Sequence, residues 1–242
     1  MKPFRLRNAW MFIFFICILM IFNTMGMSGC MKKNNTTKVR LNINTAALLY
    51  MQEKYGEKFE YYKPYGNSMS GTHSLLVRCA SLPDQDILVS IENYRRENKV
   101  FLDNYLAVKY REETFEFLLD CARQVFGEAN IFLYINYLAL SPHLLANATF
   151  IEYLSDKRVP LTFDIEVKIS NFSTNELIDQ VVDLISIYGT QFYLRIVVVE
   201  DNDYGTFDYE TFEEYIRRDK YTHCVVITRI DGFNQIRWLD ED

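Results

Sequence analysis

A strand–helix–strand succession in the second half of the sequence constrains the fold more than any other feature. Residues 161–169 alternate apolar and polar side chains, the pattern of a strand with one face on the core and one face in water. Residues 173–188 carry the apolar stripe of an amphipathic helix, and Ser173 and Glu176 predict a capping box at its start. Residues 192–199 form a second strand whose end is apolar on both faces, which predicts a place in the middle of a sheet.

Three more strand patterns extend this half of the chain. They cover residues 131–138, 223–229 and 233–239. The Asp231-Gly232 pair between the last two predicts a tight hairpin. The C-terminal half is therefore expected to fold as strands and helices alternating around a mixed sheet.

The N-terminal half has a different order of elements. Asn44 is predicted to cap a helix that stops at Gly56, and strand patterns follow at residues 58–63, 73–82 and 87–94. Asp103 is predicted to cap a long helix that runs to about residue 126. A helix packed on an antiparallel meander is expected here, so the fold class of the whole chain is α+β.

The beginning of the chain has the pattern of a signal peptide. Lys2, Arg5 and Arg7 give a basic start, and an unbroken apolar run follows from Ala9 to Phe22. A transmembrane helix needs about 20 apolar residues, whereas the core of a signal peptide needs roughly 7 to 15. The length of this run favours the signal peptide.

Met27-Ser28-Gly29-Cys30 follows the apolar run. These four residues resemble the lipobox of bacterial lipoproteins, in which a hydrophobic residue and two small ones precede a cysteine. The resemblance implies that the Cys30 thiol receives a diacylglyceryl group and that a peptidase cuts between Gly29 and Cys30. An uncleaved signal anchor with an incidental cysteine is the alternative, and both place the folded part at the outer, extracytoplasmic face of the cell membrane.

Four regions follow from these patterns. We expect a signal peptide over residues 1–29, a flexible spacer over 30–42, an N-terminal α+β half over 43–128 and a C-terminal α/β half over 129–242 packed against it. The chain has only 9 Gly and 5 Pro among 242 residues, which leaves little room for a long linker between the halves. A lipidated Cys30 would hold the protein at the membrane, because two acyl chains anchor stably whereas one is marginal.

Two short motifs strengthen the lipoprotein assignment. Glu53-Lys54-Tyr55-Gly56-Glu57 and Asp103-Asn104-Tyr105-Leu106 are similar to segments of uncharacterised lipoproteins of low-GC Gram-positive bacteria. This resemblance implies a location and no activity.

The charge of the chain limits its partners. The formal net charge is −6, and residues 1–29 hold three of the 26 basic residues and none of the 32 acidic ones, so the remainder carries −9. Phosphate binding requires a basic surface, which argues against nucleic acid as a partner.

Three cysteines remain beyond the proposed lipidation site. Cys79, Cys121 and Cys224 have no metal-type spacing and lie in apolar segments, so buried thiols are predicted, with one disulfide as the alternative.

Two polar segments are candidates for hydrolysis of envelope or extracellular substrates. Residues 66–71 approach the G-x-S-x-G nucleophile elbow, with Ser68, Ser70 and His73 as the groups involved, but the last glycine is missing and a hairpin loop is favoured. Asp201 and Asp203 lie among carboxylates that could hold a hard cation, but a loop that caps the next helix through Asp208 is favoured. We therefore predict no catalytic residue, no metal site and no cofactor.

The aromatic residues give the only functional expectation. Tyr61, Tyr62 and Tyr65 lie close together in the sequence, and tyrosine is enriched in binding surfaces because it combines apolar area with a polar end. Amphipathic packing at a sheet edge is the alternative. The predicted function is a non-catalytic binding or accessory module for an unknown envelope protein or ligand, with an extracytoplasmic hydrolase as the alternative.

Overall fold

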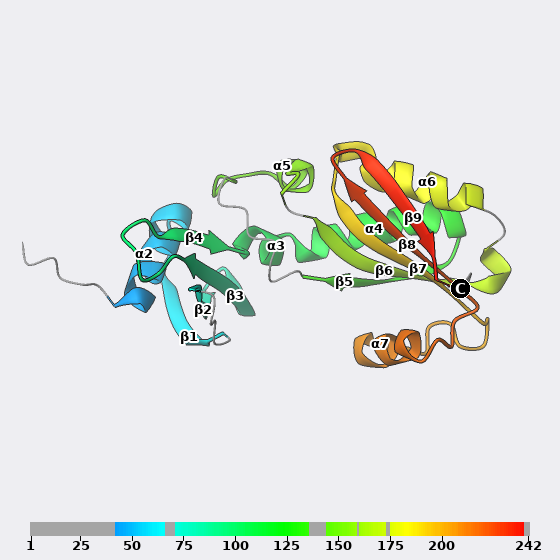
Figure 1. The fold of residues 1–242 in the computed structure, drawn as a ribbon, viewed down its shortest axis with the longest axis horizontal. Coiled ribbons are helices and arrows are strands. Elements are labelled where there is room, and N and C mark those ends of the chain that lie inside the picture. Colours follow the sequence, from blue (N-terminus) through cyan, green and yellow to red (C-terminus); the bar gives the residue numbers. More distant parts are fainter. Residues whose placement is uncertain (1–41, 66–70, 136–143, 159, 173–174, 240–242) are drawn as a thin grey trace, which may run out of the picture. The chain divides into compact units, whose positions relative to one another are not determined.

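The structure is a computed structural model that describes residues 42–65, 71–135, 144–158, 160–172 and 175–239. It contains a four-stranded and a five-stranded sheet with helices packed on them (Figure 1), which confirms the predicted α+β class. None of the helices in these residues is long and apolar enough to cross a membrane. The proposed lipidation site Cys30 and the predicted cap Ser173 lie outside the described residues.

The four-stranded sheet, sheet A, is an antiparallel meander. Its elements are α2 (Ile43–Tyr55), β1 (Phe59–Pro64), β2 (His73–Cys79), β3 (Leu82–Glu92) and β4 (Val100–Asp103). The strands lie in sequence order, β1-β2-β3-β4. Ala47 and Met51 of α2 are fully buried in the same apolar cluster as Leu75, Val77 and Val89 of the sheet. The predicted helix on a meander is confirmed, with β4 as a fourth strand that the pattern does not predict.

The start of α2 differs from the prediction. The N-cap is Asn42, whose side chain accepts a hydrogen bond from the Asn44 backbone N–H at 3.1 Å. The Asn44 carboxamide oxygen instead lies 2.9 Å from Nε2 of His73, and this contact joins the start of α2 to the first residue of β2. Gly56 ends the helix at φ 72°, a left-handed conformation that glycine adopts without steric cost.

Asp103 ends a strand and does not cap a helix, contrary to the prediction. It is the last residue of β4 and pairs with Val89 of β3. The helical segment begins after Asn104 and consists of α3 (Tyr105–Lys109) and α4 (Arg111–Phe126). Its predicted end near residue 126 is confirmed.

The five-stranded sheet, sheet B, is mixed, as predicted. Its strands are β5 (Ala129–Tyr134), β6 (Leu161–Lys168), β7 (Phe192–Val199), β8 (His223–Ile230) and β9 (Phe233–Trp238), in that spatial order. β6 and β7 are parallel and the other neighbours are antiparallel. β7 lies in the middle, as its apolar end predicts. Asp231 and Gly232 form the predicted hairpin turn with φ values of 50° and 85°.

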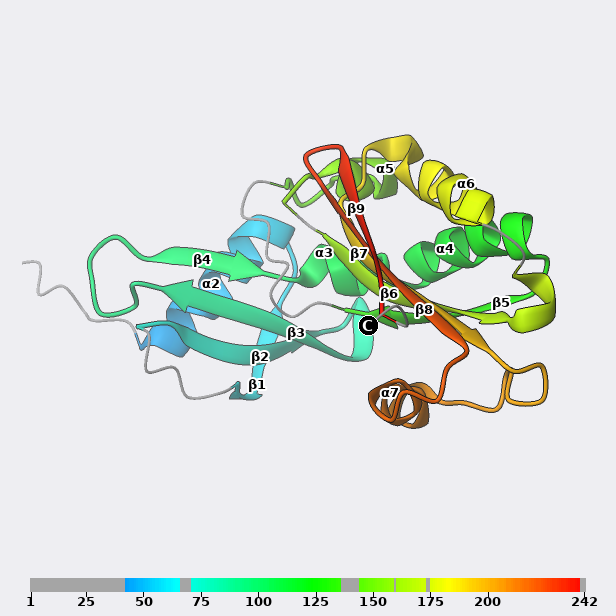
Figure 2. The ribbon, with the colours of Figure 1, turned by 45° about the vertical axis from the view of Figure 1, so that its right-hand side comes forward.

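Helices cover both faces of sheet B. The connecting elements are α5 (Phe150–Ser155), η1 (Ile169–Asn171), α6 (Asn175–Ile185), η2 (Ser186–Tyr188) and α7 (Tyr209–Arg217). Figures 1 and 2 show α4 and α6 on one side of the sheet and α7 on the other. On the first side, Leu118 of α4 and Val181 of α6 belong to one buried cluster with Phe163 and Leu194. On the second side, Phe212 of α7 packs with Val197 and Val199 in a separate cluster.

The three cysteines among the described residues are buried, as predicted. Cys79 lies in β2, Cys121 in α4 and Cys224 in β8, and none of them forms a disulfide within the described residues. Burial raises the pKa of the Cys121 thiol to about 11. These thiols serve as small apolar side chains of the core.

Candidate binding face of sheet B

Two polar side chains on one face of β6, Asp164 and Glu166, are buried, which corrects the prediction that this face is wet. Asp164 is 1 % exposed and Glu166 is 0 % exposed. Both point to the side of the sheet that carries α7, because their cross-strand partners Arg195 and Val197 are on that side. A buried carboxylate needs hydrogen-bond or charge partners, since desolvation strongly penalises it otherwise.

Arg195 supplies the partners of Asp164. Its Nε and Nη2 donate to the two carboxylate oxygens of Asp164 at 2.7 and 2.6 Å, a bidentate pair. Nη2 also donates to Oε1 of Glu213 in α7 at 2.7 Å. The Tyr134 hydroxyl in β5 lies within hydrogen-bond distance of both carboxylates, 2.6 Å from Oε1 of Glu213. We call these four residues the Arg195 cluster.

Burial and mutual hydrogen bonds shift the pKa values of the Arg195 cluster. For Asp164, burial outweighs the hydrogen bonds from Arg195 and Tyr134 and raises the pKa. Burial alone would lower the pKa of Arg195, but the hydrogen bonds and charges of Asp164 and Glu213 outweigh burial and raise it. Burial would likewise raise the pKa of Glu213, but hydrogen bonds from Tyr134 and Arg195 outweigh it and the pKa is lowered. Burial and the Asp164 charge raise the pKa of the Tyr134 phenol, so it stays protonated. The cluster therefore attaches α7 to the sheet, and Arg195 is already engaged by two carboxylates.

Glu166 attaches the loop that follows β7. Its carboxylate accepts hydrogen bonds from Nδ2 of Asn130 at 2.7 Å and from the backbone N–H of Gly205 at 3.0 Å. Gly205 has φ 72°, so a side chain there would be strained. Burial raises the pKa of Glu166 despite these two hydrogen bonds.

Toward the start of β7, α7 covers less of the same face of sheet B, although Tyr134 still contacts Glu213 and Tyr209 of that helix. One residue from each strand lines up across the sheet in the register of the Cα pairs, and we call these five residues the open row: Tyr134, Thr162, Tyr193, Thr228 and Gln235. Along this face of β7, the exposed fraction falls from 41 % at Tyr193 to 0 % at Val197, because α7 packs on Val197 and not on Tyr193. Thr162 and Thr228 are half-buried and Gln235 is exposed.

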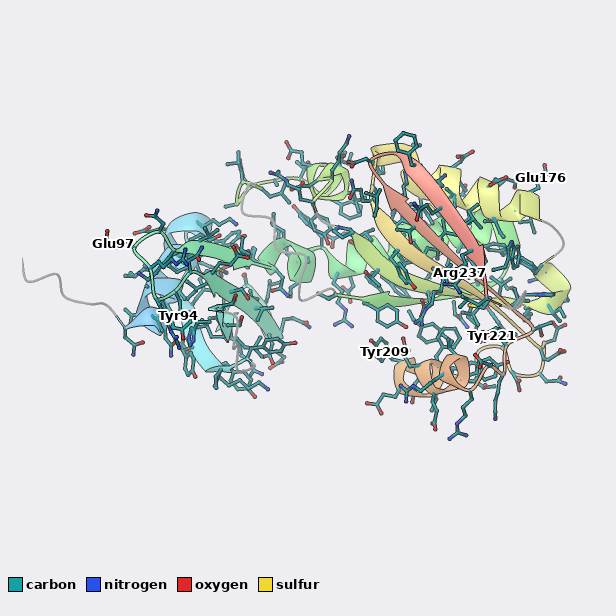
Figure 3. All side chains as sticks on the ribbon, viewed as in Figure 1. Tyr94, Glu97, Glu176, Tyr209, Tyr221 and Arg237 are labelled. Atoms are coloured by element: carbon teal, nitrogen blue, oxygen red, sulfur yellow. The ribbon has the colours of Figure 1, made fainter. Side chains whose placement is uncertain are left out.

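A pocket of about 960 Å³ adjoins the Tyr134 end of the open row. Tyr134, Thr162, Arg111 and two further tyrosines, Tyr65 and Tyr209, are among its lining residues. Tyr209 stands at the N-terminal end of α7 (Figure 3), and its ring centroid is 5.0 Å from that of Tyr134. The pocket thus gathers aromatic rings from separate elements, the arrangement expected of a ligand site.

The predicted tyrosine cluster is only partly brought to this site. Tyr61, Tyr62 and Tyr65 are 42, 44 and 40 % exposed. A register shift between Tyr61 and Lys63 interrupts the pairing of β1 with β2. The Tyr62 ring packs against the Arg78 guanidinium, whose Cζ atom lies 3.7 Å from the ring centroid. Tyr65 lines the pocket with Tyr134 and Tyr209, whereas the pocket lining does not include Tyr61 or Tyr62.

The groups predicted for hydrolysis do not meet in the described residues. Ser68 and Ser70 lie outside these residues, and His73 contacts Asn44. Asp201 accepts a hydrogen bond from the Ser170 backbone N–H at 3.2 Å, and Asp208 caps α7 through Thr211, as predicted. Within the described ranges, no three His, Cys, Asp or Glu side chains are grouped in a way that could hold a metal ion.

The two motifs that resemble lipoprotein segments lie against each other. Asp103 accepts hydrogen bonds from the Tyr55 hydroxyl at 2.6 Å, the Tyr50 hydroxyl at 2.8 Å and Nζ of Lys54 at 2.7 Å. The Tyr105 hydroxyl donates to Oε1 of Glu57 at 2.7 Å. These contacts fasten α2 to the end of β4 and the start of α3, so the motifs have a structural role.

Comparison with known proteins gives little support for any function. No family model matches the chain, and no curated protein matches it. A crystal structure of a DUF5037 family protein from Ruminococcus gnavus is similar with a TM-score of 0.39 and 14 % sequence identity, over 80 % of this chain and 94 % of that chain. A likeness this distant says nothing about function.

Proposed function

We propose that the chain is a membrane-anchored lipoprotein at the outer face of the cell membrane and that its folded part is a non-catalytic binding module for an envelope component. The anchor rests on Met27-Ser28-Gly29-Cys30 and the signal-peptide pattern before it. The binding role rests on one observation, the pocket that gathers Tyr65, Tyr134 and Tyr209 beside an open sheet face. Tyrosines around a recess are typical of recognition, because each ring offers apolar area at little entropic cost.

The anchor is tested by changing the cysteine. Cys30→Ala should abolish incorporation of labelled palmitate and release the protein from the membrane fraction or leave it unprocessed. Cys17→Ala is the matched control, because Cys17 lies within the apolar run and should leave labelling intact. Labelling that persists in Cys30→Ala would show that the lipobox assignment is wrong.

Binding and catalysis are separated in one experiment with isolated envelope material. The protein should sediment with this material without releasing soluble products, and Tyr209→Ala should weaken sedimentation. Tyr188→Ala is the control, since this tyrosine packs against Phe117 of α4 on the other side of sheet B. Loss of binding in Tyr61→Ala but not in Tyr209→Ala would show that the binding surface lies on β1 instead of beside sheet B. Product release that disappears in Ser68→Ala or Asp203→Asn would contradict the proposal and favour the hydrolase.

A further inference from the structure

The open row combines half-buried and exposed side chains of similar chemistry. Neighbouring strands lie about 4.8 Å apart, so its five residues span roughly 19 Å across sheet B. Every member ends in a hydroxyl or a carboxamide, and none carries a charge at neutral pH. The two rings, Tyr134 and Tyr193, are separated by one strand that contributes Thr162. Flat aromatic surfaces thus alternate with small hydrogen-bonding groups along one line.

This composition matches a polyhydroxylated ligand better than a peptide or a polyanion. A pyranose ring presents C–H groups on its faces and hydroxyls around its edge. Its faces can pack on tyrosine rings while its hydroxyls bond to threonine and glutamine side chains, each of which both donates and accepts. None of the five side chains offers a charge to a charged ligand, and Arg195, two residues along β7 from Tyr193, is already paired with Asp164 and Glu213.

The net charge of the protein points the same way. Residues 30–242 carry a formal charge of −9, which repels polyanions such as phosphate-linked envelope polymers. We infer that the open row binds a neutral oligosaccharide laid across the strands of sheet B, with sugar rings on Tyr134 and Tyr193. This inference deepens the proposed binding function and rests on it.

The test is calorimetric titration of the purified full chain with neutral oligosaccharides of increasing length, from disaccharide to hexasaccharide. Affinity should rise with length until the ligand covers both tyrosines. Tyr193→Ala should weaken binding about tenfold, which corresponds to roughly 1.4 kcal/mol. Thr162→Val keeps the shape of the side chain but removes a hydroxyl, and should weaken binding about fivefold.

Controls keep the result interpretable if a variant is poorly folded. Tyr193→Phe retains the ring and should keep most of the affinity, and Tyr188→Ala removes a tyrosine outside the open row and should leave affinity unchanged. Stronger binding of poly(glycerol phosphate) or oligolysine than of every neutral oligosaccharide would overturn the inference, as would equal losses in Tyr188→Ala and Tyr193→Ala.

The ligand class and the proposed function can fail separately. If no neutral oligosaccharide binds but envelope material still retains the protein in a manner that depends on Tyr193, the sugar inference is wrong and the binding function stands. If neither binds, both are wrong.

Discussion

Replacement of Asp103 by Asn tests the contacts that fasten α2 to β4. The Asp103 side chain is 2 % exposed and that of Lys54 is 14 % exposed, so the pair is almost completely removed from water. The Asp103 carboxylate also accepts hydrogen bonds from Tyr50, Tyr55 and the Tyr105 backbone N–H. Asparagine keeps the side-chain volume, so no cavity forms. It removes the negative charge, however, and its amide N–H group would face hydrogen-bond donors that need an acceptor.

The expected cost follows from the burial of the pair. Removal of one partner of a buried ion pair costs about 3–5 kcal/mol, because the other charge stays desolvated. We expect the lower end of this range for Asp103→Asn, since Lys54 retains some contact with water. Lys54→Met should cost less, about 1–2 kcal/mol, because three neutral donors still satisfy the carboxylate. Against a total stability of about 5–15 kcal/mol, the first change is a large loss.

Urea denaturation followed by far-ultraviolet circular dichroism measures both changes and the double variant. The double variant should be less destabilised than the sum of the single ones, since each partner is costly mainly when left alone. Lys58→Met is the control, because the Lys58 side chain is 79 % exposed and its pair with Glu60 lies in water, so no measurable change is expected. A loss below about 1 kcal/mol in Asp103→Asn, or additive losses in the double variant, would refute this account.

Two further predictions concern buried groups. Because burial raises the pKa of Glu166 in the folded protein, its ionised form costs stability above the unfolded pKa of about 4.3, so Glu166→Gln should stabilise the protein at neutral pH. This gain should vanish as the pH falls below about 4, and denaturation at both pH values would reveal it; a variant less stable at neutral pH would contradict the prediction. In the chain from residue 30 with Cys30→Ala, a thiol reagent should react slowly with the folded protein, since burial raises the pKa of Cys121 to about 11, and should modify all three thiols after denaturation without reductant. Uptake of one equivalent would indicate a disulfide.

Local patterns in the sequence were sufficient for most strands of sheet B. The apolar end of β7 predicts its central place, and Asp231-Gly232 predicts the last hairpin, because both depend on residues within the segment itself. The buried stripe of α6 is less well predicted. The spacing predicts a stripe of five residues, of which only two are buried, and two residues outside the stripe are buried as well. The stripe is Leu177, Val181, Leu184, Ile185 and Tyr188; the buried residues are Ile178, Val181, Val182 and Ile185.

Features that depend on distant segments could not be predicted in this way. Alternation in β6 identifies the face of Asp164 and Glu166 but not that α7, much later in the chain, covers it. The one signal was Arg195, the only charged residue in residues 192–199, whose burial in mid-sheet requires a partner. The open row was not predictable, because the register between strands is set by the fold as a whole.

Sheet A and sheet B also differ in how the chain has to find its pairings. The strands of sheet A follow one another through short connections, so each pairing closes a small loop at low entropic cost. In sheet B, β5 meets β6 only after α5, and β6 meets β7 only after α6, so the central pairings have high contact order and form slowly. Until then Phe192–Val199 is an unpaired strand rich in β-branched residues, a type of segment that is prone to aggregate while it is exposed.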